Sequence, residues 1–374
     1  MKNARRIRRY LDDQQPEMVN LLKRLILAET PSLEPSSQAG AFRLLAAALR
    51  EVGYLVRGIQ GRKSGGMLLG RPQERKRSQP LQLLLGHTDT VWPTGTLLRM
   101  PVRGNGNRIS GPGAFDMKAG LVQIVFALKA LARLQLEPTV TPVVLINSDE
   151  KIGSGDSEKW IRRLSRGSNR VFVLEPSLGE KGRLKTIRKG VGLFKITVKG
   201  RAAHAGLEPE AGASAILELS HVIQKLAALN STRNGITVNV GLVQGGLRPN
   251  VVAPEGRATV DVRVLRLKDI ETIQHAIHHL EPETPNVELQ VEGRIDRAPL
   301  EKTPRNNFPW KRAQMAAGKL GFKLEEGIAG GASDGNITSP YTATLDGLGA
   351  VGGGAHAQHY SRYCCWIPRC LRIF

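Results

Sequence analysis

The predicted strands of this chain change character near residue 190, and this change limits the folds that the chain can adopt. Before it, the strands are continuous apolar runs, such as LQLLLGH (81–87) and TPVVLIN (141–147), and helical patterns alternate with them. Strands that are apolar on both faces and alternate with helices are typical of a mostly parallel sheet covered by helices on both sides. Residues 1–189 therefore predict an α/β domain.

Between residues 190 and 299 the strands alternate apolar and polar residues, as in GLFKITVKG (192–200). This period of two indicates strands that are buried on one face only. With the two helical patterns between them, the order is β-α-β-β-α-β, which predicts a ferredoxin-like α+β unit with one antiparallel sheet. The α/β pattern returns from about residue 300. We therefore expect residues 190–299 to be inserted into a larger domain formed by residues 1–189 and 300–374.

The chain is strongly basic, with 54 Lys and Arg against 33 Asp and Glu and a formal net charge of +21. A polyanion partner is one explanation of this charge. Aromatic residues, however, make up only 5% of the chain and do not interleave with the basic clusters ARRIRRY and RPQERKR. A stacking platform for nucleic acid requires such interleaving. We therefore rank nucleic-acid binding below a basic enzyme, with acidic substrates as one reason for its charge.

The chain shows no stretch of about 18 or more apolar residues, so the sequence predicts no membrane span. Its basic, amphipathic N-terminus lacks the apolar segment and the small-residue cleavage site of a signal peptide, which predicts a cytoplasmic protein. The cysteines, Cys364, Cys365 and Cys370, lie in the last 11 residues. They form neither a disulfide framework nor a CxxC metal motif.

Acids and a histidine fall at predicted strand ends, where the side chains of a parallel sheet converge. His87 and Asp89 close one strand two residues apart, so both can point to one ion. A hydrogen-bonded turn explains this pair equally well. Glu150 and Glu175 each end a further strand. Asp116 lies in GPGAFDMKAG just before a helix, where the alternative role is to cap that helix.

His356 follows the glycine run of GAVGGGAHA. Histidines together with several carboxylates suit a divalent metal ion, and we expect zinc. Two such ions bridged by a carboxylate would activate water for hydrolysis. The residues therefore predict a metal-dependent hydrolase.

The motifs GHTDTV, GPGAFDMKAG, NSDEKIGS, LEPS, GRAAHAG, RPNVV, DVRV and GGGAHA occur in the order seen in the M20 metallopeptidases. The chain most closely resembles their glutamate carboxypeptidase (carboxypeptidase G2-like) branch, over roughly residues 15–357. The resemblance implies a di-zinc catalytic domain interrupted by a lid or dimerisation domain, and hence a homodimer. It also implies hydrolysis of an amide bond beside a carboxylate, in a small peptide or an N-acyl amino acid.

The resemblance implies a metal-binding role for four of these residues. His87 and Glu175 would bind one zinc ion, Asp116 would bridge the two ions, and His356 would bind the second. Asp89 would orient His87 from behind, as carboxylates that contact metal ligands do.

The resemblance also implies catalytic and substrate-binding roles. Glu150 would be the general base that takes a proton from the attacking water and passes it to the leaving amine. His204 would reach the site of a partner subunit and steady the tetrahedral intermediate. Asn250 and Arg263 would end adjacent strands and hold a substrate carboxylate, for which the planar fork of an arginine is well suited.

The sequence departs from the family pattern at Lys151. The family has Asp-Glu-Glu where this chain has Asp149-Glu150-Lys151, and the second Glu would be a ligand of the second zinc. An ammonium group has no lone pair to offer and repels a cation, so we expect the second ion to bind weakly. Two outcomes follow: a mono-zinc enzyme in which Lys151 stands in for the second ion, or an impaired site, which we favour. The rival function is therefore a catalytically impaired relative that binds a small carboxylate ligand.

The second departure is the tail QHYSRYCCWIPRCLRIF (358–374), which holds every cysteine and no acidic residue. The family continues here with a charged segment and a closing helix, so a helix that covers the catalytic sheet would be missing.

Overall fold

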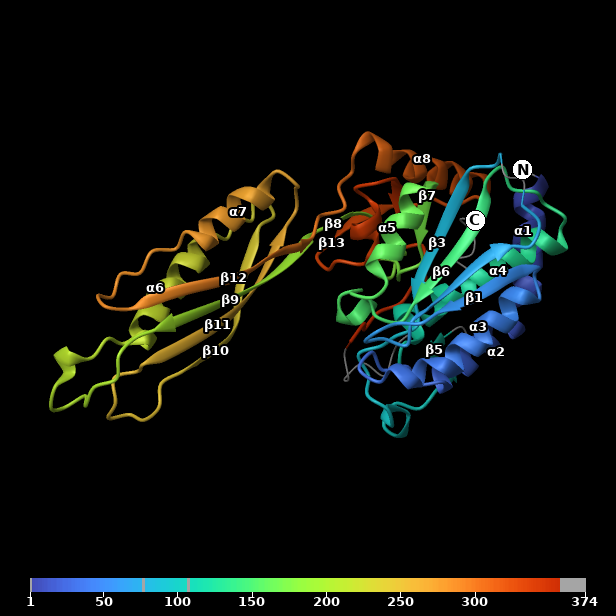
Figure 1. Cartoon of the computed structure of the whole chain (residues 1–374). Coiled ribbons are helices and arrows are strands. Elements are labelled where there is room, and N and C mark those ends of the chain that lie inside the picture. The colour runs from blue at the N-terminus through green and yellow to red at the C-terminus, as the bar shows by residue number, and fades with distance from the viewer. Residues whose placement is uncertain (1, 76–77, 106–107, 357–374) are drawn as a thin grey trace. The chain divides into compact units, whose positions relative to one another are not determined.

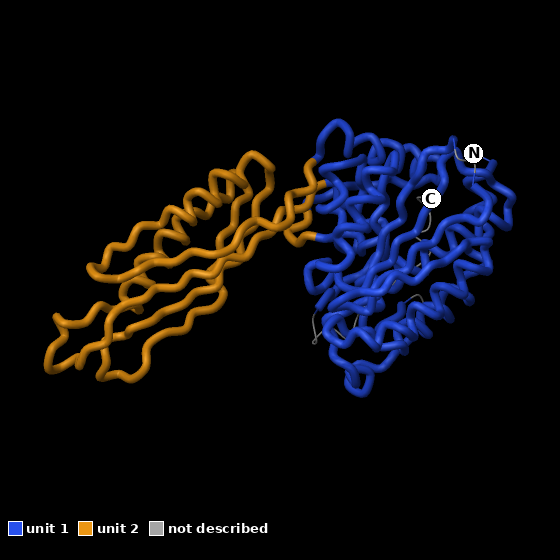
Figure 2. Tube along the Cα trace, viewed as in Figure 1, with its two compact units in different colours: residues 1–186, 302–328, 333–374 blue, residues 187–301, 329–332 orange. Residues whose placement is uncertain are grey.

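The computed structural model describes residues 2–75, 78–105 and 108–356, and the chain divides into two compact units (Figure 2). Unit 1 comprises residues 1–186, 302–328 and 333–374, and unit 2 comprises residues 187–301 and 329–332. The predicted insertion of residues 190–299 lies inside unit 2. The tail 358–374, with its cysteines, lies outside the described residues.

Unit 1 is built on a six-stranded sheet with the order β1-β2-β6-β3-β7-β14 (Figure 1). Its strands are β1 (Tyr54–Ile59), β2 (Met67–Pro72), β3 (Leu81–His87), β6 (Thr141–Asn147), β7 (Ser168–Val173) and β14 (Ala343–Leu345). The strands β6, β3, β7 and β14 pair in parallel, whereas β2 is antiparallel to both of its neighbours. The predicted mostly parallel sheet is therefore confirmed.

Helices cover both faces of this sheet. They are α1 (Lys2–Asp13), α2 (Gln15–Leu27), α3 (Gln38–Arg50), α4 (Ala119–Arg133), α5 (Glu158–Arg166), α8 (Pro304–Lys319) and α9 (Asp334–Thr338). In β3, Leu84 belongs to the core formed with α1–α4, whereas Leu83 and Leu85 belong to a second core that includes residues of α5 and α9. Because successive side chains of a strand point to opposite faces, burial on both sides requires the unbroken apolar run of β3.

Shorter elements complete the structure, and one of them, the 3₁₀ turn Pro209–Ala211, lies in unit 2. The others are the ribbon of β4 (Arg103–Asn105) and β5 (Arg108–Ser110), the pair β8 (Leu184–Arg188) and β13 (Glu326–Ala329), and the 3₁₀ turns Pro35–Ser37, Thr96–Leu98 and Glu150–Ile152. The last of these turns carries the residues at which the sequence departs from the family pattern. No helix in the described part of the chain is long and apolar enough to cross a membrane.

Unit 2 is a four-stranded antiparallel sheet with the order β10-β11-β9-β12 and two helices. Its elements are β9 (Gly190–Lys199), α6 (Ala215–Ala228), β10 (Thr237–Gly245), β11 (Glu255–Val264), α7 (Asp269–His278) and β12 (Glu288–Arg297). In β9 the buried residues Phe194, Ile196 and Val198 alternate with more exposed ones and pack in the core with α6 and α7. This is the predicted β-α-β-β-α-β arrangement.

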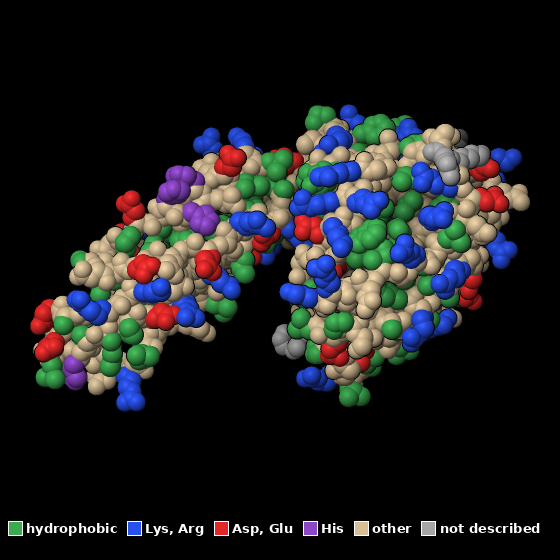
Figure 3. All heavy atoms as spheres, viewed as in Figure 1, with side chains coloured by type: hydrophobic (Ala, Val, Ile, Leu, Met, Phe, Trp, Pro, Cys, Tyr) green, Lys and Arg blue, Asp and Glu red, His purple; other side chains and the backbone are tan. Residues whose placement is uncertain are grey.

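Lys and Arg side chains are spread over the visible face of unit 1 and are not gathered into a single stripe (Figure 3). The high positive charge is therefore scattered on this face, as it is along the sequence.

Candidate active site

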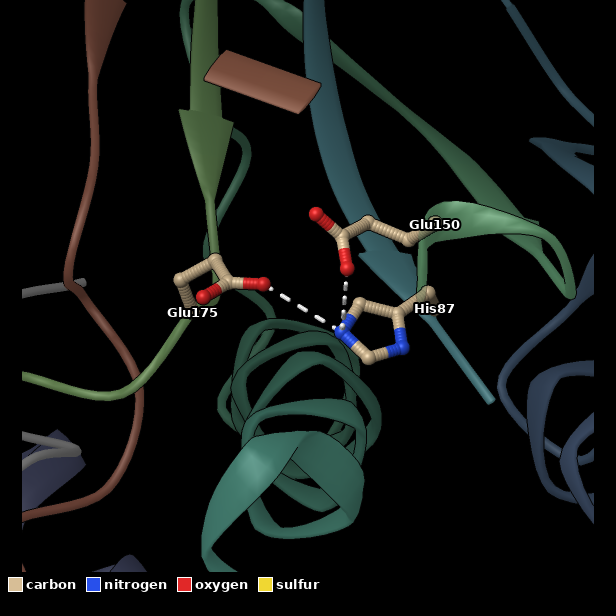
Figure 4. A group of neighbouring side chains, drawn as sticks. All are labelled: His87, Glu150 and Glu175. Carbon is tan, nitrogen blue, oxygen red and sulfur yellow. Dashed lines mark ion pairs between the residues drawn. The ribbon is translucent and has the colours of Figure 1, made fainter. Parts of the chain in front are cut away.

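Three strands of the main sheet deliver side chains to one edge. His87 is the last residue of β3, Glu150 follows β6, and Glu175 follows β7. Because β3 lies between β6 and β7, the two carboxylates meet the histidine from different sides (Figure 4). His87 Nε2 is 3.2 Å from Glu175 Oε1 and 3.8 Å from Glu150 Oε2. One donor atom from each residue lies within 4.8 Å of the others, which is compact enough for a metal centre.

Asp116 joins this cluster from the segment just before α4. Its Oδ1 lies 3.4 Å from His87 Nε2. Its Oδ2 lies 2.9 Å from Lys151 Nζ and 3.1 Å from His356 Nε2. These distances show that the two carboxylate oxygens face two neighbouring positions, one beside His87 and one beside Lys151 and His356. The peptide bond between Asp116 and Met117 is cis.

Asp89 is fully buried and fixes both His87 and the turn that carries Glu150. Its Oδ1 lies 3.3 Å from His87 Nδ1 and accepts a hydrogen bond from the Glu150 amide at 3.2 Å. Its Oδ2 accepts hydrogen bonds from the Lys151 amide at 3.0 Å and from the Ser32 hydroxyl at 2.7 Å. The sequence analysis missed Ser32, which lies 57 residues away and belongs to none of its motifs.

The tautomer of neutral His87 follows from these contacts. Its Nδ1 lies 2.9 Å from the backbone oxygen of Asp89, which can only accept a hydrogen bond. Nδ1 therefore carries the hydrogen, and Nε2 presents its lone pair to the acids.

The ionisable groups of the cluster hold one another in their charged forms. Burial raises the pKa of the Asp116 carboxyl, but the ammonium of Lys151 and contacts with His87 and His356 outweigh it and hold this pKa well below its usual range. Burial lowers the pKa of Lys151, but the surrounding carboxylates, with Glu150 first, raise it well above its usual range. These carboxylates therefore favour the ammonium form of Lys151, whose side chain is only 9% exposed.

The pKa of His87 shows what a bound metal would displace. Burial and the charge of Lys151 lower this pKa, but close contacts with the surrounding acids, with Asp116 first, raise it well above its usual range. A metal ligand must be the neutral imidazole, so metal binding would release this proton.

The residues present fit one divalent ion. His87 Nε2 and Asp116 Oδ1 are buried, and within the described residues neither has a hydrogen-bond partner of good geometry. Glu175 Oε1 lies beside the same nitrogen. One imidazole nitrogen and two carboxylate oxygens are a ligand set that divalent zinc accepts, with a further position open to substrate or water.

Two glycines allow the backbone around Glu175 to pack closely. A Cβ added to Gly120, in α4, would clash with the carbonyl oxygen of Leu174. A Cβ added to Gly349 would clash with the carbonyl oxygens of Leu174 and Glu175. The amide of Gly349 donates a hydrogen bond to the Glu175 carbonyl at 2.8 Å. Glu175 is thus positioned by two segments whose close approach leaves no room for a side chain.

A pocket beside the cluster is lined by residues that include Trp92, Met100, Phe115, Asp116, Lys151 and His356. Trp92 and Phe115 were not among the predicted site residues. Trp92 directly follows the motif GHTDTV and Phe115 lies within GPGAFDMKAG, so their nearness to predicted site residues was the available signal. The pocket places apolar side chains next to the acids.

His204 and Asn250 lie together in unit 2. A β-bridge joins His204 to Val251, and the amide of Ala205 donates to the carbonyl of Asn250 at 3.0 Å. Asn250 lies five residues before Glu255, the first residue of β11 (255 − 250), whereas Arg263 is the penultimate residue of that strand.

Within one chain, Asn250 and Arg263 do not end adjacent strands, as expected, but lie toward opposite ends of β11. Most of β11 separates them, and at ~3.3 Å per residue this is on the order of 25 Å. Arg263 instead contacts the Asp261 carboxylate through Nε at 2.8 Å and donates through Nη1 to the carbonyl of Gly330 at 2.8 Å. These contacts fix the position of the guanidinium. Arg263 also pairs with Val191 in β9, which lies a few residues after the start of unit 2 in the sequence.

Comparisons with known proteins identify the family. The family model described as Peptidase dimerisation domain, M20_dimer, matches residues 186–285, which lie almost wholly in unit 2. Carboxypeptidase G2 of Pseudomonas sp. (strain RS-16) is 26% identical over 355 residues, covering 92% of this chain and 84% of that protein. The chain thus carries an M20 dimerisation domain and is similar to M20 metallopeptidases over most of its length.

Solved structures share the fold of this chain. Aminopeptidase PepT from Bacillus cereus matches with a TM-score of 0.78 and 20% identity, covering 96% of both chains. The YXEP protein of Bacillus subtilis, described as a dinuclear metal binding peptidase from the M20 family, matches with a TM-score of 0.70 and 13% identity, again covering 96% of both chains. In this chain the acids and histidines gather at the sheet edge together with a lysine.

Proposed function

We propose that this protein is a metal-dependent hydrolase that cleaves an amide bond next to a carboxylate, in a small peptide or an N-acyl amino acid. The observation that carries the proposal is the position of His87 Nε2, which lies 3.4 Å from Asp116 Oδ1 and 3.2 Å from Glu175 Oε1. The similarity to a carboxypeptidase over 92% of the chain supports the same reaction class.

The metal would be held by His87, Asp116 and Glu175, and we propose zinc. When bound, it would supply a Lewis acid that polarises the scissile carbonyl and makes water a better nucleophile. Asp89 would keep the His87 ring in the tautomer that presents Nε2. The backbone oxygen of Asp89 would set this tautomer, and its carboxylate, 3.3 Å from the same nitrogen, would support the ring without itself facing the ion.

Glu150 is the general base of this proposal. Its carboxylate lies beside the ligand atoms but on a separate strand end, 3.8 Å from His87 Nε2. There it can take a proton from the attacking water and pass it to the leaving amine. The ammonium of Lys151, at 2.9 Å from Glu150 Oε2, holds this carboxylate in place.

Unit 2 would supply substrate recognition. Arg263 is fixed by Asp261 and Gly330, and a guanidinium held in this way is suited to bind the substrate carboxylate. His204 and Asn250 lie together away from Arg263, so we propose that they act as a pair in the site of a partner subunit.

The proposed homodimer would form through unit 2. β10 is an edge strand of the sheet, and its side chains Leu242 and Val243 are 66% and 53% exposed. Leu247, just beyond this strand, is 72% exposed. An unpaired strand edge with exposed apolar side chains is a natural surface for a second copy.

The proposal is tested by assaying purified protein on a panel of N-acyl amino acids and dipeptides, with and without a chelator. We expect amide hydrolysis that is lost on chelation and restored by zinc. Binding of the carboxylate products without any turnover would instead favour the impaired relative considered from the sequence.

A further inference from the structure

We infer that this protein holds one metal ion per chain, and that the ammonium of Lys151 takes the position of a second cation. The inference rests on the proposed function, because it concerns the same cluster. It concerns the position where the sequence predicts weak binding of a second ion.

Lys151 points into the cluster. Its Nζ lies 2.9 Å from Asp116 Oδ2 and 2.9 Å from Glu150 Oε2. Its side chain is only 9% exposed, although a lysine normally keeps its ammonium in water. The ammonium therefore bridges two carboxylates, as a metal ion in that position would.

The contacts of Asp116 define the two positions. Its Oδ1 faces His87 and is available to an ion there. Its Oδ2 already contacts Lys151 Nζ and, at 3.1 Å, His356 Nε2. An ion bound to Oδ2 at about 2.0–2.2 Å would lie against the ammonium, which repels it and offers no lone pair.

Formal charge supports a single ion. Three carboxylates face the cluster, those of Asp116, Glu150 and Glu175, and Lys151 reduces their charge from −3 to −2. One divalent ion balances this charge, whereas a second would leave an excess of +2. A fourth carboxylate, Asp89, directs its Oδ2 at a backbone amide and a hydroxyl group behind the cluster.

The backbone fixes Lys151 in this position. Its amide donates to Asp89 Oδ2 at 3.0 Å, and the residue lies in the 3₁₀ turn Glu150–Ile152. The carboxylate that orients His87 therefore also anchors the lysine. Moving the lysine backbone away would break a contact on which the metal ligand itself depends.

The experiment counts metal by inductively coupled plasma mass spectrometry, after full-length protein is equilibrated with zinc and freed of excess ion. We expect one zinc per chain in the wild type and two in Lys151→Glu, which supplies a carboxylate in place of the ammonium. Lys159→Glu, an exposed charge reversal on α5, is the matched control and should stay at one.

Each count has a distinct meaning. Two ions in the wild type, or one in a folded Lys151→Glu protein, would overturn the inference and leave the proposed hydrolase intact. No ion in the wild type would overturn the proposed function itself. If Lys151→Glu does not fold, electron paramagnetic resonance of the manganese-loaded wild type decides. Isolated Mn²⁺ supports one ion per chain, and a spin-coupled pair contradicts it.

Discussion

The backbone amide of Lys151 donates a hydrogen bond to Oδ2 of Asp89, whose Oδ1 lies 3.3 Å from the ring of His87. One buried carboxylate thus sets the position of a metal-ligand histidine and of the cation beside it. The first prediction tests this double role.

Asp89→Asn should weaken metal binding by about 10–100-fold, as loss of a carboxylate that orients a ligand histidine typically does. The amide NH₂ of Asn would meet either the Nδ1 hydrogen of His87 or a backbone N–H, because it replaces an acceptor with a donor. Competition against a chelating dye measures the affinity. Asp156→Asn is the control, since Asp156 also accepts backbone amides, from residues 62–64, but does so away from the cluster. Equal zinc affinity in the two variants would contradict the role given to Asp89.

Glu150→Gln should lower kcat by about 10²–10⁴-fold while the metal count stays at its wild-type value, because a positioned general base contributes in this range. Hydrolysis rates and metal content are measured on the same preparation. Glu158→Gln is the matched control on α5, where Glu158 pairs with Arg162 at the surface. A parallel loss of metal and activity in Glu150→Gln would make Glu150 a ligand and not the base.

Mixing inactive subunits should reveal which residues act in the partner's site. His204→Ala protein mixed with Glu150→Gln protein should recover about a quarter of wild-type activity, since half of randomly formed dimers contain one intact site. Asn250→Ala should behave in the same way, because Asn250 lies with His204.

Arg263→Ala is the contrasting variant in this experiment. Arg263 lies at the other end of β11, and we expect it to serve its own chain, so mixing it with Glu150→Gln should recover nothing. Alone, Arg263→Ala should lower kcat/KM at least tenfold on a carboxylate substrate, since a charge-assisted hydrogen bond contributes about 1.5–3 kcal/mol. Equal rates on the acid and its neutral amide would exclude this recognition.

The buried Lys118 should make stability depend on pH. Burial lowers the pKa of its ammonium to about 7, and Glu29 opposes this only in part. In the unfolded chain Lys118 keeps the ordinary pKa of 10.5. Between about pH 7 and 10 the unfolded chain therefore binds a proton at Lys118 that the folded protein does not bind. The free energy of unfolding should therefore rise with pH over this window, by at most about 1.4 kcal/mol per unit.

Urea denaturation of metal-free protein at pH 7.5 and 9.5 measures this effect. Lys118→Met removes the titrating group and should flatten the dependence by about the same amount. Parallel pH profiles for the wild type and this variant would show that Lys118 keeps its proton in the folded protein.

Gly349→Ala should weaken metal binding by displacing Glu175, because its methyl group would meet the carbonyl oxygens of Leu174 and Glu175. Gly353→Ala, four residues on, has open space around its Cβ and is the control. Isothermal titration with zinc compares the two. If Gly349→Ala lowers thermal stability but leaves the zinc affinity unchanged, the close approach at Gly349 serves the fold alone.

Local patterns predicted the elements of this structure well. The continuous apolar run of β3 reflects burial on two faces, and the alternating run of β9 reflects burial on one face. This difference can be read from the sequence of a single strand. The motif order also placed His87, Asp116, Glu150 and Glu175 at one edge, where the structure brings them together.

Long-range contacts were beyond these patterns. The bond from Ser32 to Asp89 joins segments 57 residues apart, and no local period marks it. The expectation that Asn250 and Arg263 end adjacent strands is a different case. The motif RPNVV precedes β11, and DVRV forms the end of the same strand. Because a strand is extended, its length keeps the two motifs apart.

The ammonium of Lys151 and a metal ion reach the protein by different routes. An ion must be acquired from the surroundings, can be lost to a chelator and is exchanged for whichever metal is abundant. A cation that is part of the polypeptide arrives with translation, at a fixed ratio of one per chain, and stays through starvation for metal. In this protein one of the two cationic positions beside Asp116 is thus encoded in the gene, and only the other depends on the environment.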